Sequence, residues 1–137
     1  MSLGNSAALH RAIYDVLAND AGITACVGGH IYDALPAGPL PEVFISLGIE
    51  VVNDRSDKTG RGSEHDFIIS VITTQPGFLR AKDVAAEIGR ALLDRPIDFG
   101  DLALVYLTFT RADARRDTDT QTRRIDLGFR ARIDNPA

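Results

Sequence analysis

Apolar and polar residues alternate without a break along Arg124-Ile-Asp-Leu-Gly-Phe-Arg-Ala-Arg-Ile-Asp134. The odd-numbered positions, from Ile125 to Ile133, are apolar, and the even-numbered positions are charged apart from Gly128. Successive side chains of a β-strand point to opposite faces of a sheet, so this alternation predicts a strand with one buried face. A shift of one residue would bring the charges into the core, so the register of this strand is firmly specified.

Three segments upstream also have the composition of strands: Val43–Val52, Phe67–Thr74 and Leu102–Thr110. The second and third are apolar on both faces, which predicts that both are internal strands. In the first, alternation predicts one shared apolar face, made of Val43, Ile45, Leu47, Ile49 and Val51.

Helical spacing of apolar residues predicts two main helices, Ser6–Asn19 and Leu79–Leu93, and Ile23–Val27 is predicted to be a short apolar turn or helical stub. The order is therefore helix, two strands, helix, two strands. Neighbouring strands joined by polar connections favour antiparallel hairpins with the helices on one face. We expect an α+β protein with a mainly antiparallel four-stranded sheet, two main helices packed on one face and long hairpin loops.

Composition bounds the class of protein. The chain has 137 residues, 45% hydrophobic and 25% charged, which is typical of a single soluble domain over residues 1–137. Its one cysteine excludes an intrachain disulfide and a cysteine-based zinc site. No apolar run reaches the ~20 residues of a membrane span, and the N-terminus lacks signal-peptide features, so we expect a cytoplasmic protein without membrane contact. The net charge of −4 argues against nonspecific nucleic-acid binding.

Tests for catalysis find no constellation of residues. The three histidines, His10, His30 and His65, are scattered, and each is expected on the surface or in a loop. Cys26 is expected to be an inert buried thiol. One alternative is a small hydrolase or ligand-binding enzyme that uses His65 with Glu64 or Asp66, but adjacent residues on a strand point to opposite faces. The sequence predicts no enzyme, no cofactor and no metal.

Two polar connections are longer than a hairpin needs: residues 53–64 and residues 112–122. They are either solvated loops or arms that contact a partner, and ordering each residue costs about 1–2 kcal/mol unless a contact fixes it. The arm hypothesis assigns assembly contacts to Arg55, Asp57, Lys58, Arg61, Arg115, Arg116, Asp117 and Asp119.

Arg130 and Arg132 lie on the polar face of the last predicted strand. This face is either a solvated sheet face or an edge strand charged against aggregation. Alternatively it is a subunit interface, in which the two arginines meet carboxylates of a neighbour in bidentate pairs.

An ordered set of short segments runs from the predicted helix Ala7–Asn19 to Arg130-Ala-Arg132. Between them stand Val27-Gly-Gly-His-Ile-Tyr-Asp33, Pro36–Pro41, Leu47-Gly48, Lys58-Thr-Gly-Arg-Gly-Ser-Glu-His65, Ala81-Lys82 with Ala85, and Arg115-Arg-Asp-Thr-Asp119. In this combination the chain resembles the tail-completion or tail-terminator proteins of long-tailed phages, prophages and gene transfer agents. It departs from them in His30, where arginine is usual, and in Ile72-Thr73, where a tryptophan-serine-like pair is expected.

The resemblance implies a structural, non-enzymatic virion protein assembled in the bacterial cytoplasm. Such proteins form rings, usually hexameric, that cap the head-proximal end of the tail tube and join it to the head connector. The implied partners are further copies of the chain, the tail tube protein and connector proteins, and DNA passes through the lumen without specific binding. A head–tail adaptor or stopper of the same neck is the alternative role.

Overall fold

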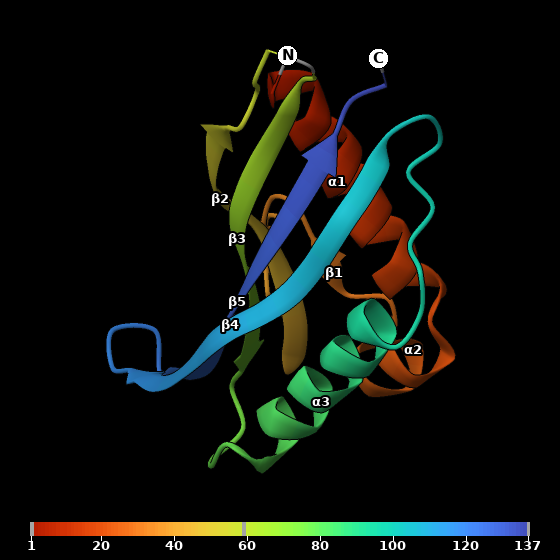
Figure 1. Ribbon diagram of the computed structural model, residues 1–137. Coiled ribbons are helices and arrows are strands. Elements are labelled where there is room, and N and C mark those ends of the chain that lie inside the picture. Colours follow the sequence, from red (N-terminus) through yellow and green to blue (C-terminus); the bar gives the residue numbers. More distant parts are fainter. Residues whose placement is uncertain (1, 59, 137) are drawn as a thin grey trace.

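A computed structural model describes residues 2–58 and 60–136 (Figure 1). Within these residues the elements, in chain order, are α1 (Ser2–Asn19), α2 (Ala21–Val27), β1 (Ile31–Tyr32), β2 (Val43–Asp54), β3 (Gly62–Thr73), α3 (Leu79–Leu93), β4 (Ala103–Asp117) and β5 (Thr122–Asp134). None of the helices in this described part is long and apolar enough to cross a membrane.

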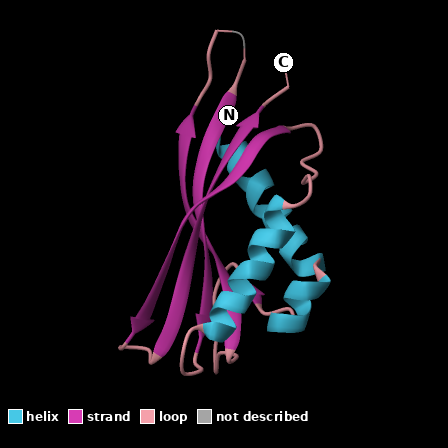
Figure 2. Cartoon of the chain, turned by 60° about the horizontal axis from the view of Figure 1, so that its bottom comes forward, coloured by secondary structure: helices cyan, strands magenta, loops and turns pink. Residues whose placement is uncertain are grey.

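The strands form one five-stranded sheet in the order β1-β2-β3-β5-β4. β1 runs parallel to β2, and the other neighbours are antiparallel. The helices lie on one face of this sheet (Figure 2). The predicted α+β class and the mainly antiparallel pairing are confirmed, whereas the predicted number of four strands is wrong, because the sheet has five. Its missing member, β1, has two residues, which is too short to show an alternating pattern.

β5 lies between β3 and β4, with its predicted register. Its odd-numbered residues from Ile125 to Ile133 are buried against the helices. The ring of Phe129 is 1% exposed; it stacks on Phe67 at 5.6 Å between centroids and meets Phe109 edge-on at 5.8 Å. The alternative that β5 is a charged edge strand is therefore wrong.

The helices cover the sheet with apolar stripes. α3 buries Val84, Ile88 and Leu92, as its spacing predicts. α2 is a full short helix, capped at its start by the Asp20 side chain, which accepts a hydrogen bond from the Ile23 N–H at 3.0 Å.

α1 begins at Ser2, four residues before the predicted start at Ser6. Asparagine often caps the start of a helix, but Asn5 lies within α1 and its side chain is buried. Its side-chain amide donates to the Ser63 hydroxyl and exchanges hydrogen bonds with the Asn135 side chain. Tertiary contacts with the sheet thus outweigh the local preference of asparagine for a cap.

A β-bulge at Gly48 changes the faces of β2. Leu47 and Gly48 together oppose one residue of β3, and Gly48 has a φ of 133°, which favours glycine. The extra residue reverses the alternation, so that Ile49 and Val51 lie on the face without helices, 60% and 59% exposed. The predicted single apolar face of Val43–Val52 is therefore wrong beyond Leu47.

Both predicted long loops are shorter than expected, because the strands take up part of each. β2 and β3 continue pairing until only residues 55–61 connect them. Residues 112–117 and 122 pair within the β4–β5 hairpin, which leaves a turn of residues 118–121. β3 is internal as predicted, but β4 is an edge strand, because its apolar residues face the helices only in part.

Replacing Phe129 with alanine tests the packing centre of the sheet. We expect Phe129→Ala to lower the free energy of unfolding by about 3–5 kcal/mol, because it removes a fully buried ring and leaves a cavity. Chemical denaturation measures the loss. Leu79→Ala, at a side chain that is 75% exposed, is the control and should change stability by less than about 0.5 kcal/mol. Equal stability of the two variants would contradict this packing.

Candidate assembly surface

The face of the sheet opposite the helices carries two clusters of ion pairs. We call it the open face, formed by the residues of β2 to β5 that point away from the helices. Its charged side chains come mainly from β3, β4 and β5 and lie side by side because the strands pair in register.

The first cluster joins Arg130 to the carboxylates of β3. The Arg130 Nε lies 2.7 Å from the Asp66 Oδ1 and 3.9 Å from the Glu64 Oε1. Arg55 also binds Glu64, at 3.3 Å, and the Tyr106 hydroxyl donates to the same carboxylate at 3.1 Å. The hydrogen bond to Asp66 raises the pKa of Arg130. Glu64 therefore links β3 to the β2–β3 connection through Arg55, to β5 through Arg130 and to β4 through Tyr106.

Arg132 closes this cluster on the side of the β2–β3 connection. Its Nε donates to Asp134 at 3.1 Å, and its Nη2 donates to the backbone carbonyl of Arg55 at 3.2 Å. The structure thus brings together three predicted assembly residues: Arg55, Arg130 and Arg132. Arg130 and Arg132 bind carboxylates of their own chain, and their role between subunits stays a prediction.

The second cluster is centred on Asp126 of β5. This carboxylate binds Arg115 at 3.0 Å and Arg124 at 3.1 Å, and it accepts a hydrogen bond from the Ser70 hydroxyl at 2.6 Å. Burial raises the pKa of Asp126, but the Ser70 hydrogen bond and the two guanidinium groups outweigh it, so its pKa is below the ordinary value. Of the arm residues predicted in 112–122, only Arg115 belongs to this cluster.

The remaining predicted residues lie at the two hairpin ends, which project from opposite ends of the sheet (Figures 1 and 2). Asp57 accepts a hydrogen bond from the Gly60 N–H at 2.8 Å, close to the exposed Lys58 and Arg61. At the other end the Asp117 carboxylate accepts from the N–H of Asp119, and Arg116 is exposed. The structure does not bring these two groups together.

A buried polar relay connects α1 to the sheet. His65 is fully buried, so its predicted place on the surface is wrong. Its Nδ1 lies 2.9 Å from the Glu50 Oε2 and its Nε2 lies 2.7 Å from the Ser63 Oγ. Because a carboxylate only accepts, the proton of this contact lies on Nδ1, and Nε2 pairs with the Ser63 hydroxyl. The Asn5 amide donates to the same hydroxyl at 2.7 Å.

Glu50 completes the relay from β2. Burial raises the pKa of Glu50, but hydrogen bonds from His65 and from the Ser6 hydroxyl outweigh it and hold the pKa below the ordinary value. The alternation of residues in Val43–Val52 does not predict this contact, because Glu50 faces the helices only through the bulge at Gly48. The signal was a glycine inside a strand pattern, which is typical of a bulge.

Serine, histidine and glutamate in this order resemble a catalytic triad in connectivity. However, Ser63 is fully buried and its oxygen is covered by Asn5, so no substrate reaches it. Glu64 and Asp66, the predicted partners of His65, lie on the open face away from it. The geometry therefore supports a structural relay.

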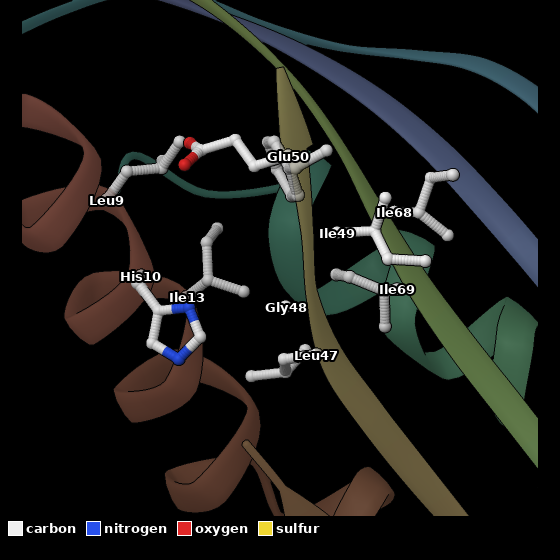
Figure 3. Close-up of a pocket in the computed structure, with 10 residues that line it drawn as sticks. Leu9, His10, Ile13, Leu47, Gly48, Ile49, Glu50, Ile68 and Ile69 are labelled. Carbon is white, nitrogen blue, oxygen red and sulfur yellow. The ribbon is translucent and has the colours of Figure 1, made fainter. Parts of the chain in front are cut away.

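A small cavity lies beside the relay, between α1 and the bulged part of β2 (Figure 3). Leu9, Ile13 and Leu47 line it together with His10 and Glu50. Its volume of about 40 Å³ holds on the order of one or two water molecules. Among the described residues, no three histidine, cysteine or acidic side chains are placed to hold a metal ion, and Cys26 is half-buried at the edge of the core.

Comparison with known proteins gives the family. Residues 11–134 match the model of the family described as tail completion protein gp17. A chain of the virion of a native gene transfer agent particle is 48% identical, with a TM-score of 0.88 over 95% of this chain and 97% of that one. No protein with a curated description matches.

The family match and the similar virion chain define this protein as a structural tail component of a phage-like particle. The family match covers most of the sequence, so the chain belongs to the tail completion protein gp17 family. The resemblance drawn from the ordered short segments is confirmed.

The lowered pKa of Asp126 predicts a pH-dependent contribution to stability. This contribution is complete above the ordinary pKa of 3.8 and is lost as the pH falls through the lower pKa of the folded state. At pH 7, Asp126→Asn should lower the free energy of unfolding by about 1–3 kcal/mol, because two guanidinium groups lose their negatively charged partner. The difference from wild type should narrow as the pH falls below the ordinary pKa of 3.8.

Urea unfolding at pH 7 and at pH 3 measures this difference. Asp15→Asn removes an exposed carboxylate of α1 and is the matched control. A gap between wild type and Asp126→Asn that stays constant with pH would contradict the assignment.

Ser63→Ala tests the structural reading of the relay. It leaves His65 Nε2 and the Asn5 amide without their buried partner, so we expect a loss of about 1–3 kcal/mol in unfolding free energy. Ser56→Ala, at an exposed serine, is the control for thermal or chemical denaturation. Unchanged stability combined with the loss of a hydrolytic activity would instead favour an enzyme.

Proposed function

We propose that this protein is a non-enzymatic tail terminator that forms a ring, hexameric by analogy with the proteins it resembles. The ring caps the head-proximal end of the tail tube, ends tube polymerisation and joins the tail to the head connector. The observation that carries the proposal is the match to the tail completion family over residues 11–134. The virion chain that is 48% identical adds a likeness to a component of an assembled particle.

The placement of the two hairpin ends supports a role between two neighbours. The described residues of the β2–β3 connection, 55–58 and 60–61, and residues 118–121 project from opposite ends of the sheet (Figure 2). A subunit of this shape can contact the tail tube with one end and the connector with the other. Repetition of one heterologous contact around an axis closes a ring.

Charge supports passage of DNA through such a ring. The chain has a net charge of −4, and most arginines of the open face already bind carboxylates of the same chain. Guanidinium groups held in this way release fewer counterions from DNA, so they retain a moving duplex weakly. We infer that DNA passes without specific binding and that assembly takes place in the bacterial cytoplasm.

Deletion of the gene separates the proposal from an adaptor or stopper role in the same neck. Loss of a terminator should give overlong tails in negative-stain electron micrographs. Loss of an adaptor should give tails of normal length that are detached from full heads. Particles with attached tails of normal length would contradict both roles.

Charge reversal at Arg116 tests the hairpin end. Arg116 is exposed and Arg115 binds Asp126, so Arg116→Glu changes the end without breaking the second ion-pair cluster. We expect Arg116→Glu to reduce tail joining at least ~10-fold in a complementation assay, because a reversed charge repels the partner. The double variant, Arg115→Glu with Arg116→Glu, should reduce tail joining further. Circular dichroism should show that both variants are folded.

Arg11→Glu makes the same charge change at an exposed position of α1 and is the control. Full complementation by Arg116→Glu and by the double variant would indicate that this end of the hairpin is a solvated turn that makes no assembly contact.

A further inference from the structure

The two edges of the sheet carry backbone N–H and C=O groups that can pair with a further strand. β1 pairs with β2 only at Ile45 and Ser46. From Leu47 to Asn53, no strand of the described chain lies beside β2 on the side away from β3. An edge strand with unpaired N–H and C=O groups is a template for another strand.

The register shows which groups point outward. The Arg55 N–H donates to the Gly62 carbonyl at 2.8 Å, so this pair is hydrogen-bonded. Bonded and non-bonded pairs alternate in an antiparallel ladder, which places the N–H and C=O groups of Glu50 and Val52 on the outer side of β2. The neighbouring side chains of Ile49 and Val51 are 60% and 59% exposed.

This edge carries only part of the protection that edge strands usually have. From Gly48 to Asn53 it has no lysine and no proline, although the bulge at Gly48 and the inward-pointing Glu50 both discourage pairing. The bulge at Gly48 lies at its start, and beyond it the register with β3 is regular through Asp54.

The opposite edge of the sheet, β4, has matching features. It pairs only with β5 among the described strands. Val105, Tyr106 and Phe109 are large exposed apolar residues on it. Through the registers of β3 and β5, Val51 lies at the level of Thr108, so the apolar parts of the two edges stand at the same height along the strands.

Strand direction makes the two edges compatible. β2, β3, β5 and β4 are successive antiparallel neighbours, so β2 and β4 run in opposite directions. A second copy placed beside the first in the same orientation would therefore present its β4 antiparallel to this β2. The charges also agree: β2 has Glu50 and Asp54 and no basic residue, whereas β4 has three arginines and two aspartates.

We propose that the β2 edge from Gly48 to Asn53 binds the β4 edge of a second copy of this chain, so that one sheet continues from subunit to subunit. The inference rests on the proposed ring and specifies its contact. Backbone hydrogen bonds of Glu50 and Val52 supply affinity, and burial of Val51 beside Thr108 and Tyr106 of the second copy adds to it.

Disulfide formation between the two edges tests the proposal. In a Cys26→Ser background, Val51→Cys is combined with Tyr106→Cys or with Thr108→Cys, all on the open face. Mild oxidation of assembled particles should give a ladder of covalent multimers for at least one pair, because cross-strand neighbours lie within disulfide distance. Val51→Cys with Leu79→Cys is the control, since Leu79 is exposed but lies on α3.

Amide hydrogen exchange on the unmodified protein gives a second reading. The outward amides of Glu50 and Val52 should exchange freely in the isolated subunit and about tenfold slower or more in the particle. The exposed loop of residues 35–40 is the internal reference.

The outcomes separate the inference from the proposed function. Multimers and slowed exchange support the edge contact. If particles show a ring but neither covalent multimers nor slowed exchange, the edge contact is wrong and the proposed ring is retained. Particles that contain this protein without any ring overturn the proposed function, and the edge contact with it.

Discussion

The bulge at Gly48 is the constraint on which the rest of the structure depends. One extra residue in β2, with a backbone angle that favours glycine, reverses the faces of everything that follows it. Glu50 turns inward to His65, while Ile49 and Val51 turn outward. Without the bulge, a carboxylate would lie on the open face and two apolar side chains would crowd the N-terminal turns of α1.

The inward turn of Glu50 determines how α1 is held. The N-terminal part of this helix meets the sheet through hydrogen bonds of Asn5 and Ser6. Farther along, Leu9, Ile13 and Leu17 pack in the apolar core. Polar groups that are buried together and fully paired define one geometry, because each unpaired alternative carries a desolvation cost. The relay thus specifies where α1 lies, and the apolar stripe supplies most of the burial.

Periodic patterns predicted those elements whose burial is uniform along their length. β5 and α3 each keep one buried face from end to end, and both were predicted with nearly their observed bounds. Prediction failed where a long-range contact overrides the local pattern. The hydrogen bond to Ser63 keeps Asn5 inside α1. The two residues of β1 are a strand only because they pair with β2, and residues 112–117 are strand because they pair with β5. The charged candidate residues were found by composition, but their partners within the chain follow only from the register.

That register separates the open face from the edges of the sheet. On the open face, Arg115, Arg130 and Arg132 bind carboxylates of their own chain, so a partner there would have to replace bonds that already exist. At the edges, the backbone groups of β2 beyond Ser46 and the outer side of β4 have no neighbouring strand in the described chain. A new strand at an edge adds hydrogen bonds and buries exposed apolar side chains without breaking an ion pair. We therefore expect a larger physical gain from association at the edges than on the open face, and under the proposed edge contact the charged residues alone would mark the interface incompletely.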